Sequence, residues 1–406
     1  MSAMSERVQK LKELSVTTNP YISTERAELL TNFYKSGGTA LVSTPVARAL
    51  AFKYILENQS IFIGEGELIV GERGPAPRAT PTYPELCCHK LKDLDILNTR
   101  ERQPFHVSED ARRIYVEKII RFWKGKTMRE RVFASVSQEW MDAFDAGVFT
   151  EFMEQRAPGH AILDDKVYYK GFTDFKQEIQ DRLDALNYFE DPEAYKKEQE
   201  LKAMAITADA LVAFAKRYAE KAQKLAAQER DPQRRNELLQ IAEICSHVPA
   251  HPPRTFWEAL QIYWFVHLGV IIELNVWDSF NPGRLDQNLY PFYKKDLQEG
   301  IMTKEFAQEL LKCFWIKFNN HPAPPKVDIT EEQSGTYQDF ALINIGGVTE
   351  DGKDAVNELS YVLLDIIEEM RLIQPSTCIQ LSRKNLDRFL KRALEVVRTG
   401  FGQPSI

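Results

Sequence analysis

The chain has 406 residues, of which 44% are hydrophobic and 11% aromatic, and its formal net charge is −7 at pH 7. This length predicts two or three structural units or one large barrel, and the acidic balance argues against a general nucleic-acid binder. Residues 1–14 are polar and charged, unlike a signal peptide. The longest apolar run, 260–272, is shorter than the roughly 20 residues that span a bilayer. We therefore expect a soluble, cytoplasmic protein.

Cysteine usage argues against a disulfide framework and against a metal site. The five cysteines are an odd number in a long chain. Cys87, Cys88 and His89 are adjacent, but no second ligand pair follows at the spacing of a zinc site. We expect reduced, packed thiols and no bound metal.

Helix signals dominate the chain. Thr44 and Asp231 each precede a proline, a pattern typical of a helix N-terminus, and Thr303 and Asn385 are expected N-caps. An apolar pattern with few polar positions predicts a helix that is buried on all sides, with His267 as a hydrogen-bonded core residue rather than a catalytic one. Predicted helices cover 44–58, 190–229, 231–245, 255–272, 303–318, 353–371 and 385–398.

Strand signals are fewer and shorter. Apolar runs bounded by glycine, proline or polar residues predict strands at 68–70, 340–345 and 377–381. A predicted helix separates the last two, and a strand–helix–strand unit implies parallel strands. Gly346 and Gly347 allow a backbone turn at the end of the first of these strands, without the pattern of a phosphate-binding loop.

Three polar stretches are candidate site segments. Residues 274–287 bring two carboxylates, an arginine and two large aromatics directly after the most apolar helix; they line a pocket or form a bonded Asp–Arg pair at a helix end. Residues 321–336 form a long loop before a strand, which contacts a substrate or simply connects two elements. His160 follows Pro158 and Gly159 at a turn, where an acid/base role and an ordinary loop role are equally plausible.

Taken together, six separated motifs resemble the N-terminal half of the glycyl radical enzymes, the family of pyruvate formate-lyase, of glycerol and diol dehydratases and of choline lyase. They are residues 64–72, 81–85, 154–160, 282–287, 344–347 and 400–404. The resemblance covers essentially the whole chain. It implies an α/β fold: the helix-rich N-terminal half of the family's ten-stranded α/β barrel. Residues 1–406 would then be a pyruvate formate-lyase-type domain, truncated before the catalytic cysteine loop and without the C-terminal glycine radical domain.

Within that family the chain is most similar to the hydroxyproline dehydratases, which implies radical elimination of water from trans-4-hydroxy-L-proline to give 1-pyrroline-5-carboxylate. The resemblance implies that Asp278 binds the substrate ammonium, His160 lies near the leaving hydroxyl and Ser334 near the carboxylate, while Phe152 and Phe340 wall the ring. It also implies an S-adenosylmethionine iron–sulfur activating enzyme as partner, which installs the glycyl radical, and a homodimer at full length. No cofactor is expected to bind this chain directly.

The chain lacks the two radical motifs of the family, because none of its cysteines lies in Gly-Cys-x-Glu and no Arg-Val-x-Gly-Tyr occurs. We therefore expect a partial sequence that is inactive alone. Two alternatives stay open. One is another glycyl radical eliminase or a formate acetyltransferase-like enzyme, with a diol, glycerol, choline or sulfonate substrate. The other is a non-catalytic fragment or one subunit of a split enzyme.

Overall fold

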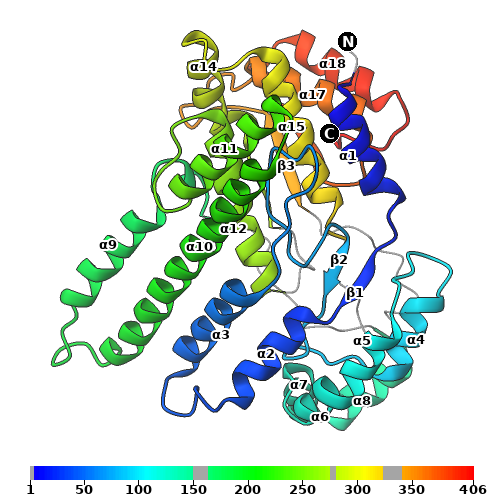
Figure 1. Cartoon of the computed structure of the whole chain (residues 1–406), viewed down its shortest axis with the longest axis vertical. Helices are drawn as coiled ribbons and strands as arrows, with labels where there is room; N and C mark the ends of the chain where they lie inside the picture. The colour runs from blue at the N-terminus through cyan, green and yellow to red at the C-terminus, as the bar shows by residue number, and fades with distance from the viewer. Residues whose placement is uncertain (1–3, 150–162, 275–279, 323–340) are drawn as a thin grey trace.

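The computed structural model describes residues 4–149, 163–274, 280–322 and 341–406 (Figure 1). Helices outnumber strands throughout these ranges. The strands are β1 (Tyr21–Ser23), β2 (Ala79–Pro81), β3 (Leu342–Gly346) and β4 (Ser376–Gln380). The helices are α1 (Glu6–Thr17), α2 (Glu25–Lys35), α3 (Thr44–Asn58), α4 (Leu91–Thr99), α5 (Glu109–Ile114), η1 (Tyr115–Ile119), α6 (Ile120–Trp123), α7 (Met128–Ser135), α8 (Gln138–Asp145), η3 (Lys166–Tyr168), α9 (Phe172–Asp184), α10 (Ala194–Gln228), α11 (Pro232–His247), α12 (Phe256–Glu273), α13 (Leu285–Asn288), α14 (Tyr290–Gln298), α15 (Lys304–Asn319), α17 (Glu358–Met370) and α18 (Asp387–Val397).

The described strands form two small parallel sheets. β1 pairs with β2, and Tyr21 of β1 also bridges to His106. β3 pairs with β4 in the register Leu342 to Ser376, and α17 connects the two strands. The strand–helix–strand prediction is therefore confirmed, as is the expectation of a helix-rich chain with parallel strands.

Two further segments extend the β3–β4 pair without forming full strands. Gly283 bridges to Ile343 of β3, and Ser405 bridges to Cys378 of β4, both in the parallel sense. The result is a parallel ribbon in the spatial order 281–283, β3, β4 and 403–405. α18 connects β4 to the last of these segments.

Helix α12 lies at the centre of the molecule, with α10 and α15 packed near it (Figure 1). Fifteen of its 18 residues are buried, including the polar residues Glu258, Gln261 and His267. A helix without a polar stripe is stable only when its neighbours cover every face, and α12 meets this condition as predicted. On the outer side, α10 packs along α3, α9 and α11.

The predicted strand at 68–70 is wrong, and α12 supplies the reason. Trp257 Nε1 donates to the Leu68 carbonyl at 3.0 Å, and Gln261 bonds both the N–H and the carbonyl of Val70 at 2.9 and 2.8 Å. Trp264 Nε1 donates to the next carbonyl along, at 3.0 Å. These three side chains recur on one face of α12. They satisfy buried backbone groups that would otherwise need a neighbouring strand.

The N-cap predictions hold in two cases and fail in two. Thr303 and Asp231 cap α15 and α11 through their side chains. The cap of α3 is Ser43, one residue before the predicted position. Asn385 does not cap α18, which starts two residues later, because its side-chain oxygen instead accepts from the Ser382 N–H at 2.7 Å, while its amide donates to the Gly347 carbonyl at 2.7 Å. The long helix predicted at 190–229 spans Ala194–Gln228.

None of the five cysteines, all of which lie in described parts of the chain, forms a disulfide. Cys87, Cys245 and Cys313 are buried. Burial raises the pKa of Cys313 to about 12, and burial together with nearby carboxylates raises that of Cys88 to about 12. Both side chains are therefore neutral thiols at pH 7. Within the described ranges no helix combines the length and apolar character needed to cross a membrane.

Candidate functional site

The five residues predicted to form the pocket, Phe152, His160, Asp278, Ser334 and Phe340, lie outside the described residues. They occur in three segments, 150–162, 275–279 and 323–340. The described structure shows how the residues on either side of these segments are held. That framework is built from the motifs at 64–72, 81–85, 282–287 and 344–347.

The C-terminal end of α12, which precedes the segment 275–279, is fixed by Arg26 and Tyr83. The last carbonyls of a helix have no partner within the helix. Here the Tyr83 hydroxyl donates to the Ile271 carbonyl, and Arg26 Nε donates to the Ile272 carbonyl at 2.5 Å. Arg26 is buried, forms an ion pair with Glu85 at 2.5 Å and lies 4.1 Å above the Tyr83 ring. Residues 81–85 therefore act as a support for the end of α12.

The stretch after residue 279 is held by the end of β3. Asp286 is fully buried; its Oδ2 accepts from the Gly346 N–H at 2.9 Å and from Ser360 Oγ at 2.5 Å. Arg284 donates to the Gly346 carbonyl at 3.0 Å. Burial raises the pKa of Asp286, and the hydrogen bonds from Ser360 and Gly346 oppose that rise. Asp286 and Arg284 each bond the backbone of Gly346, and both readings of residues 274–287 stay predictions. The other carboxylate, Asp278, lies outside the described residues.

Two of the three site segments are followed by residues that lie side by side. Asn281 Oδ1 accepts from the Leu342 N–H at 2.8 Å, and the Gly283 carbonyl accepts from the Asn344 N–H at 2.8 Å. Residues two to four positions after 279 therefore pair with residues two to four positions after 340. The parallel ribbon brings together chain positions that are 60 residues apart in sequence.

A buried charge cluster holds the end of α15, which precedes the segment 323–340. Lys317 Nζ lies 2.8 Å from Glu67 Oε1 and 2.6 Å from Glu72 Oε1, and all three side chains are buried. His321 Nε2 lies 2.5 Å from Glu72 Oε2. Burial opposes ionisation of Glu72, but the charge of Lys317 and the hydrogen bonds from Lys317 and His321 outweigh it and lower the pKa of Glu72 to about 2. Burial also disfavours the charged ammonium, yet the two carboxylates raise the pKa of Lys317.

Two histidines stack against the ring of Trp264. The Trp264 ring is 5.3 Å from His321 and 5.2 Å from His267, with interplanar angles of 14° and 20°. Burial lowers the pKa of His267 to about 3 and that of His321 to about 4. Both imidazoles are therefore neutral at pH 7. His267 is a buried core residue, as predicted. Separately, the Arg73 guanidinium donates to the Pro322 carbonyl and so holds the last residue before the segment 323–340.

Sequence reasoning singled out residues 64–72 and 81–85 only through the family resemblance and missed Arg26, Lys317 and His321. Arg26 and Lys317 lie on amphipathic helices, where a basic residue normally faces solvent. Their burial depends on carboxylates and carbonyls that are distant in sequence. His321 was noted only as the first residue of a long loop. No local signal distinguishes it from a connector residue.

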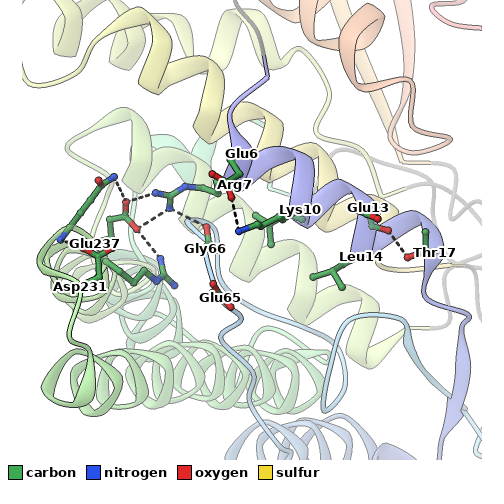
Figure 2. Close-up of a pocket in the computed structure, with 13 residues that line it drawn as sticks. Glu6, Arg7, Lys10, Glu13, Leu14, Thr17, Glu65, Gly66, Asp231 and Glu237 are labelled. Carbon is green, nitrogen blue, oxygen red and sulfur yellow. Dashed lines mark hydrogen bonds and ion pairs between the residues drawn. The ribbon is translucent and has the colours of Figure 1, made fainter.

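Two cavities border this framework. The smaller, about 540 Å³, lies between α1, the turn at 64–66 and α11 (Figure 2). Its polar groups largely bond one another: Arg7 donates to Glu237 Oε2 at 2.9 Å and to the Gly66 carbonyl at 3.1 Å, and Arg234 reaches Glu237 at 3.1 Å. The charged groups that line this cavity therefore form a structural ion-pair network.

The larger cavity, about 870 Å³, lies between α3, α9, α10 and α12. Its wall includes Leu163, which directly follows the segment 150–162, and Leu274, which directly precedes the segment 275–279. Leu163 and Leu274, next to two of the site segments, therefore line one cavity, and residues 281–283 pair with β3, which follows the third segment, in the ribbon.

Comparisons with known proteins agree with this arrangement. A profile of the family described as pyruvate formate lyase-like matches residues 3–406. The chain is 53% identical to trans-4-hydroxy-L-proline dehydratase from Clostridioides difficile over 98% of its own length and 51% of the relative's. It is 33% identical to isethionate sulfite-lyase from Nitratidesulfovibrio vulgaris, over 100% and 50% of the two lengths.

Solved structures show the same fold. The structure of hydroxyproline dehydratase from Clostridioides difficile with bound trans-4-hydroxy-L-proline superposes with a TM-score of 0.95 at 52% identity, covering 99% of this chain and 51% of that one. The B12-independent glycerol dehydratase from Clostridium butyricum superposes with a TM-score of 0.93 at 35% identity, covering 99% and 50%. The chain spans about half the length of the relatives it matches. It belongs to the pyruvate formate lyase-like family, the glycyl radical enzymes.

Proposed function

We propose that this chain supplies the N-terminal part of a glycyl radical hydro-lyase that converts trans-4-hydroxy-L-proline to 1-pyrroline-5-carboxylate. The proposal is carried by the difference in sequence identity between this chain and relatives of different activity. Identity to the hydroxyproline dehydratase is 53%, whereas identity to the isethionate sulfite-lyase is 33%, over nearly the same residues. Residues 1–406 would form a pyruvate formate-lyase-type domain, the N-terminal half of a ten-stranded barrel.

The radical chemistry would come from the remainder of the protein. A cysteine thiyl radical, generated from a glycyl radical that an S-adenosylmethionine iron–sulfur enzyme installs, would abstract a hydrogen atom from C5 of the substrate. The C4 hydroxyl then leaves as water, and return of a hydrogen atom from the thiol completes a net loss of one water. A homodimer is the proposed assembly.

The residues of this chain would bind the substrate and promote departure of the hydroxyl. A carboxylate at Asp278 would hold the ring ammonium through a charge-assisted hydrogen bond. His160 would hydrogen-bond the C4 hydroxyl and so ease its loss, and Ser334 would bond the carboxylate. Phe152 and Phe340 would pack on the two sides of the pyrrolidine ring and exclude water.

The described framework supports the convergence of these residues. The chain enters the parallel ribbon immediately after the segments that contain Asp278 and Phe340, at the adjacent positions Asn281 and Leu342. The large cavity meets Leu163 and Leu274, which adjoin the segments of His160 and Asp278. Such a meeting of distant segments on a rigid scaffold is the usual way in which barrels build their sites.

The runner-up is a glycyl radical eliminase with another substrate. The similarity to a glycerol dehydratase at 35% identity favours this alternative over a non-enzymatic role. A diol or glycerol carries no ammonium group, so its enzyme has no need of a carboxylate at position 278. The substrate dependence of an Asp278 variant therefore separates the two proposals.

The test is an anaerobic reconstitution. The chain is mixed with the separately produced remainder of the Clostridioides difficile dehydratase, its activating enzyme and S-adenosylmethionine, then offered hydroxyproline or glycerol. We expect a glycyl radical doublet by electron paramagnetic resonance, and pyrroline carboxylate only from the combined halves. Asp278→Asn is expected to lower kcat/KM for hydroxyproline about 10- to 100-fold, the effect of losing a hydrogen bond to a charged group, whereas Asp110→Asn on the exposed surface is neutral. Turnover by the chain alone, or preferential turnover of glycerol, contradicts the proposal.

A further inference from the structure

Helix α18 has an apolar face that the described protein leaves uncovered. Three side chains form this face, and they are 36, 47 and 37% exposed, in chain order. They are Leu390, Leu394 and Val397, here called the α18 stripe. The spacings of four and three residues place all of them within about 60° of the helix circumference.

The other side of α18 is already occupied by α17. Phe389, Ala393 and Val396 are buried, with the Phe389 ring centroid 6.0 Å from that of Tyr361 on α17. Arg392 also forms ion pairs at 2.6 Å with Asp365 and Glu368 of α17. The buried face and the stripe together make one apolar arc of about 160°, so α18 has the pattern of a helix with two helical neighbours.

The topology indicates what the second neighbour is. α17 connects β3 to β4, α18 connects β4 to the segment 403–405, and these helices lie beside each other at the edge of the molecule (Figure 1). Another strand added beside 403–405 would need its own crossover helix, which would lie beside α18 on the side of the stripe. The relatives have about as much chain again as the part that this protein matches.

We infer that the α18 stripe is the docking surface for a helix from the polypeptide that makes up the other half of the relatives' length. The border of the stripe adds a requirement on that helix. Lys391 and Arg398 lie on its outer edge and form no ion pair with any described residue. The docked helix therefore presents an apolar seam to the stripe and carboxylates to these two cations. This inference rests on the proposed two-part protein but not on the proposed substrate.

The test measures association between the two halves without substrate, radical or activating enzyme. The 406-residue chain is co-expressed with the tagged remainder of the Clostridioides difficile dehydratase, the complex is purified through the tag, and its affinity is measured by sedimentation. We expect a one-to-one complex for the wild type. Leu390→Glu with Leu394→Glu is expected to weaken it at least about 100-fold, as is typical when central apolar contacts of an interface are lost. Lys391→Glu is expected to weaken it about 3- to 10-fold, and less at high salt.

The matched control is Leu239→Glu on α11, because Leu239 is 49% exposed but lies away from the stripe. A second double variant, Leu390→Ala with Leu394→Ala, removes the contacts without introducing charge. The melting temperature and the circular dichroism spectrum of every variant are recorded, so that a lost contact can be told from a lost fold. Three results overturn the inference: no complex with the wild type, an affinity of the double glutamate variant within about 3-fold of wild type, or a homodimer of the chain that the same substitutions disrupt. A wrong substrate assignment changes none of these readings.

Discussion

Replacing Lys317 by methionine should strongly destabilise the protein, because this ammonium is the shared cation of two buried carboxylates. Lys317 is 2% exposed and lies 2.8 Å from Glu67 and 2.6 Å from Glu72. Removing one partner of a buried ion pair leaves an uncompensated charge, at a cost of about 3–5 kcal/mol. A typical domain has only about 5–15 kcal/mol of stability, so this change removes a large fraction of it.

The assay is urea unfolding of the 406-residue chain, with the free energy of unfolding compared at constant m-value. Lys304→Met is the control, since Lys304 lies on the same helix and pairs with Glu358 at 2.5 Å, but both of these side chains are exposed; a much smaller loss is expected there, because exposed ion pairs contribute little to stability. Adding Glu67→Gln and Glu72→Gln to the Lys317 variant should restore much of the loss. A loss below about 1 kcal/mol for Lys317→Met, or no recovery in the triple variant, would refute the electrostatic reasoning.

Three further outcomes are expected. The pKa of His267 is lowered to about 3 in the folded state, so the unfolded chain binds a proton first as the pH falls below the ordinary pKa of 6.5, and the free energy of unfolding declines by about 1.4 kcal/mol per pH unit. His267→Leu should therefore remove about 2 kcal/mol of the stability loss between pH 7 and pH 5, measured by urea titration. Equal pH slopes for the variant and the wild type would contradict this. Tyr83→Phe leaves the Ile271 carbonyl without its bond at the end of α12 and should lower the free energy of unfolding by about 1–3 kcal/mol; an unchanged urea midpoint would show that this bond is dispensable. Gly346→Ala places a Cβ 2.5 Å from an aromatic ring at φ +84°, whereas Gly352→Ala meets open space at φ +76°, so the first should lower the melting temperature clearly more than the second, and equal shifts would exclude the clash as the cause.

Much of the fold was predictable because it rests on local patterns. Period and capping predicted α11, α12 and α15, since a side-chain cap acts within three residues and an all-apolar helix has no alternative to burial. The unit formed by β3, α17 and β4 was predictable because a helix between two short apolar runs implies parallel pairing. The family was recognisable because its motifs are short stretches with fixed residue types.

The remaining features required the tertiary structure, because each depends on groups far apart in the chain. Residues 68–70 have strand-like composition, but their backbone groups bond side chains of α12 that lie 189 and 191 residues later in the chain. Asn385 has the residue type of an N-cap, yet its side-chain oxygen accepts from the Ser382 N–H and its amide donates to the distant Gly347 carbonyl. Lys317 and Arg26 look like surface cations in sequence. Only the folded chain surrounds them with the carboxylates and carbonyls that allow a charge to be buried, because hydrogen bonds and ion pairs across the core follow spatial proximity and not sequence spacing.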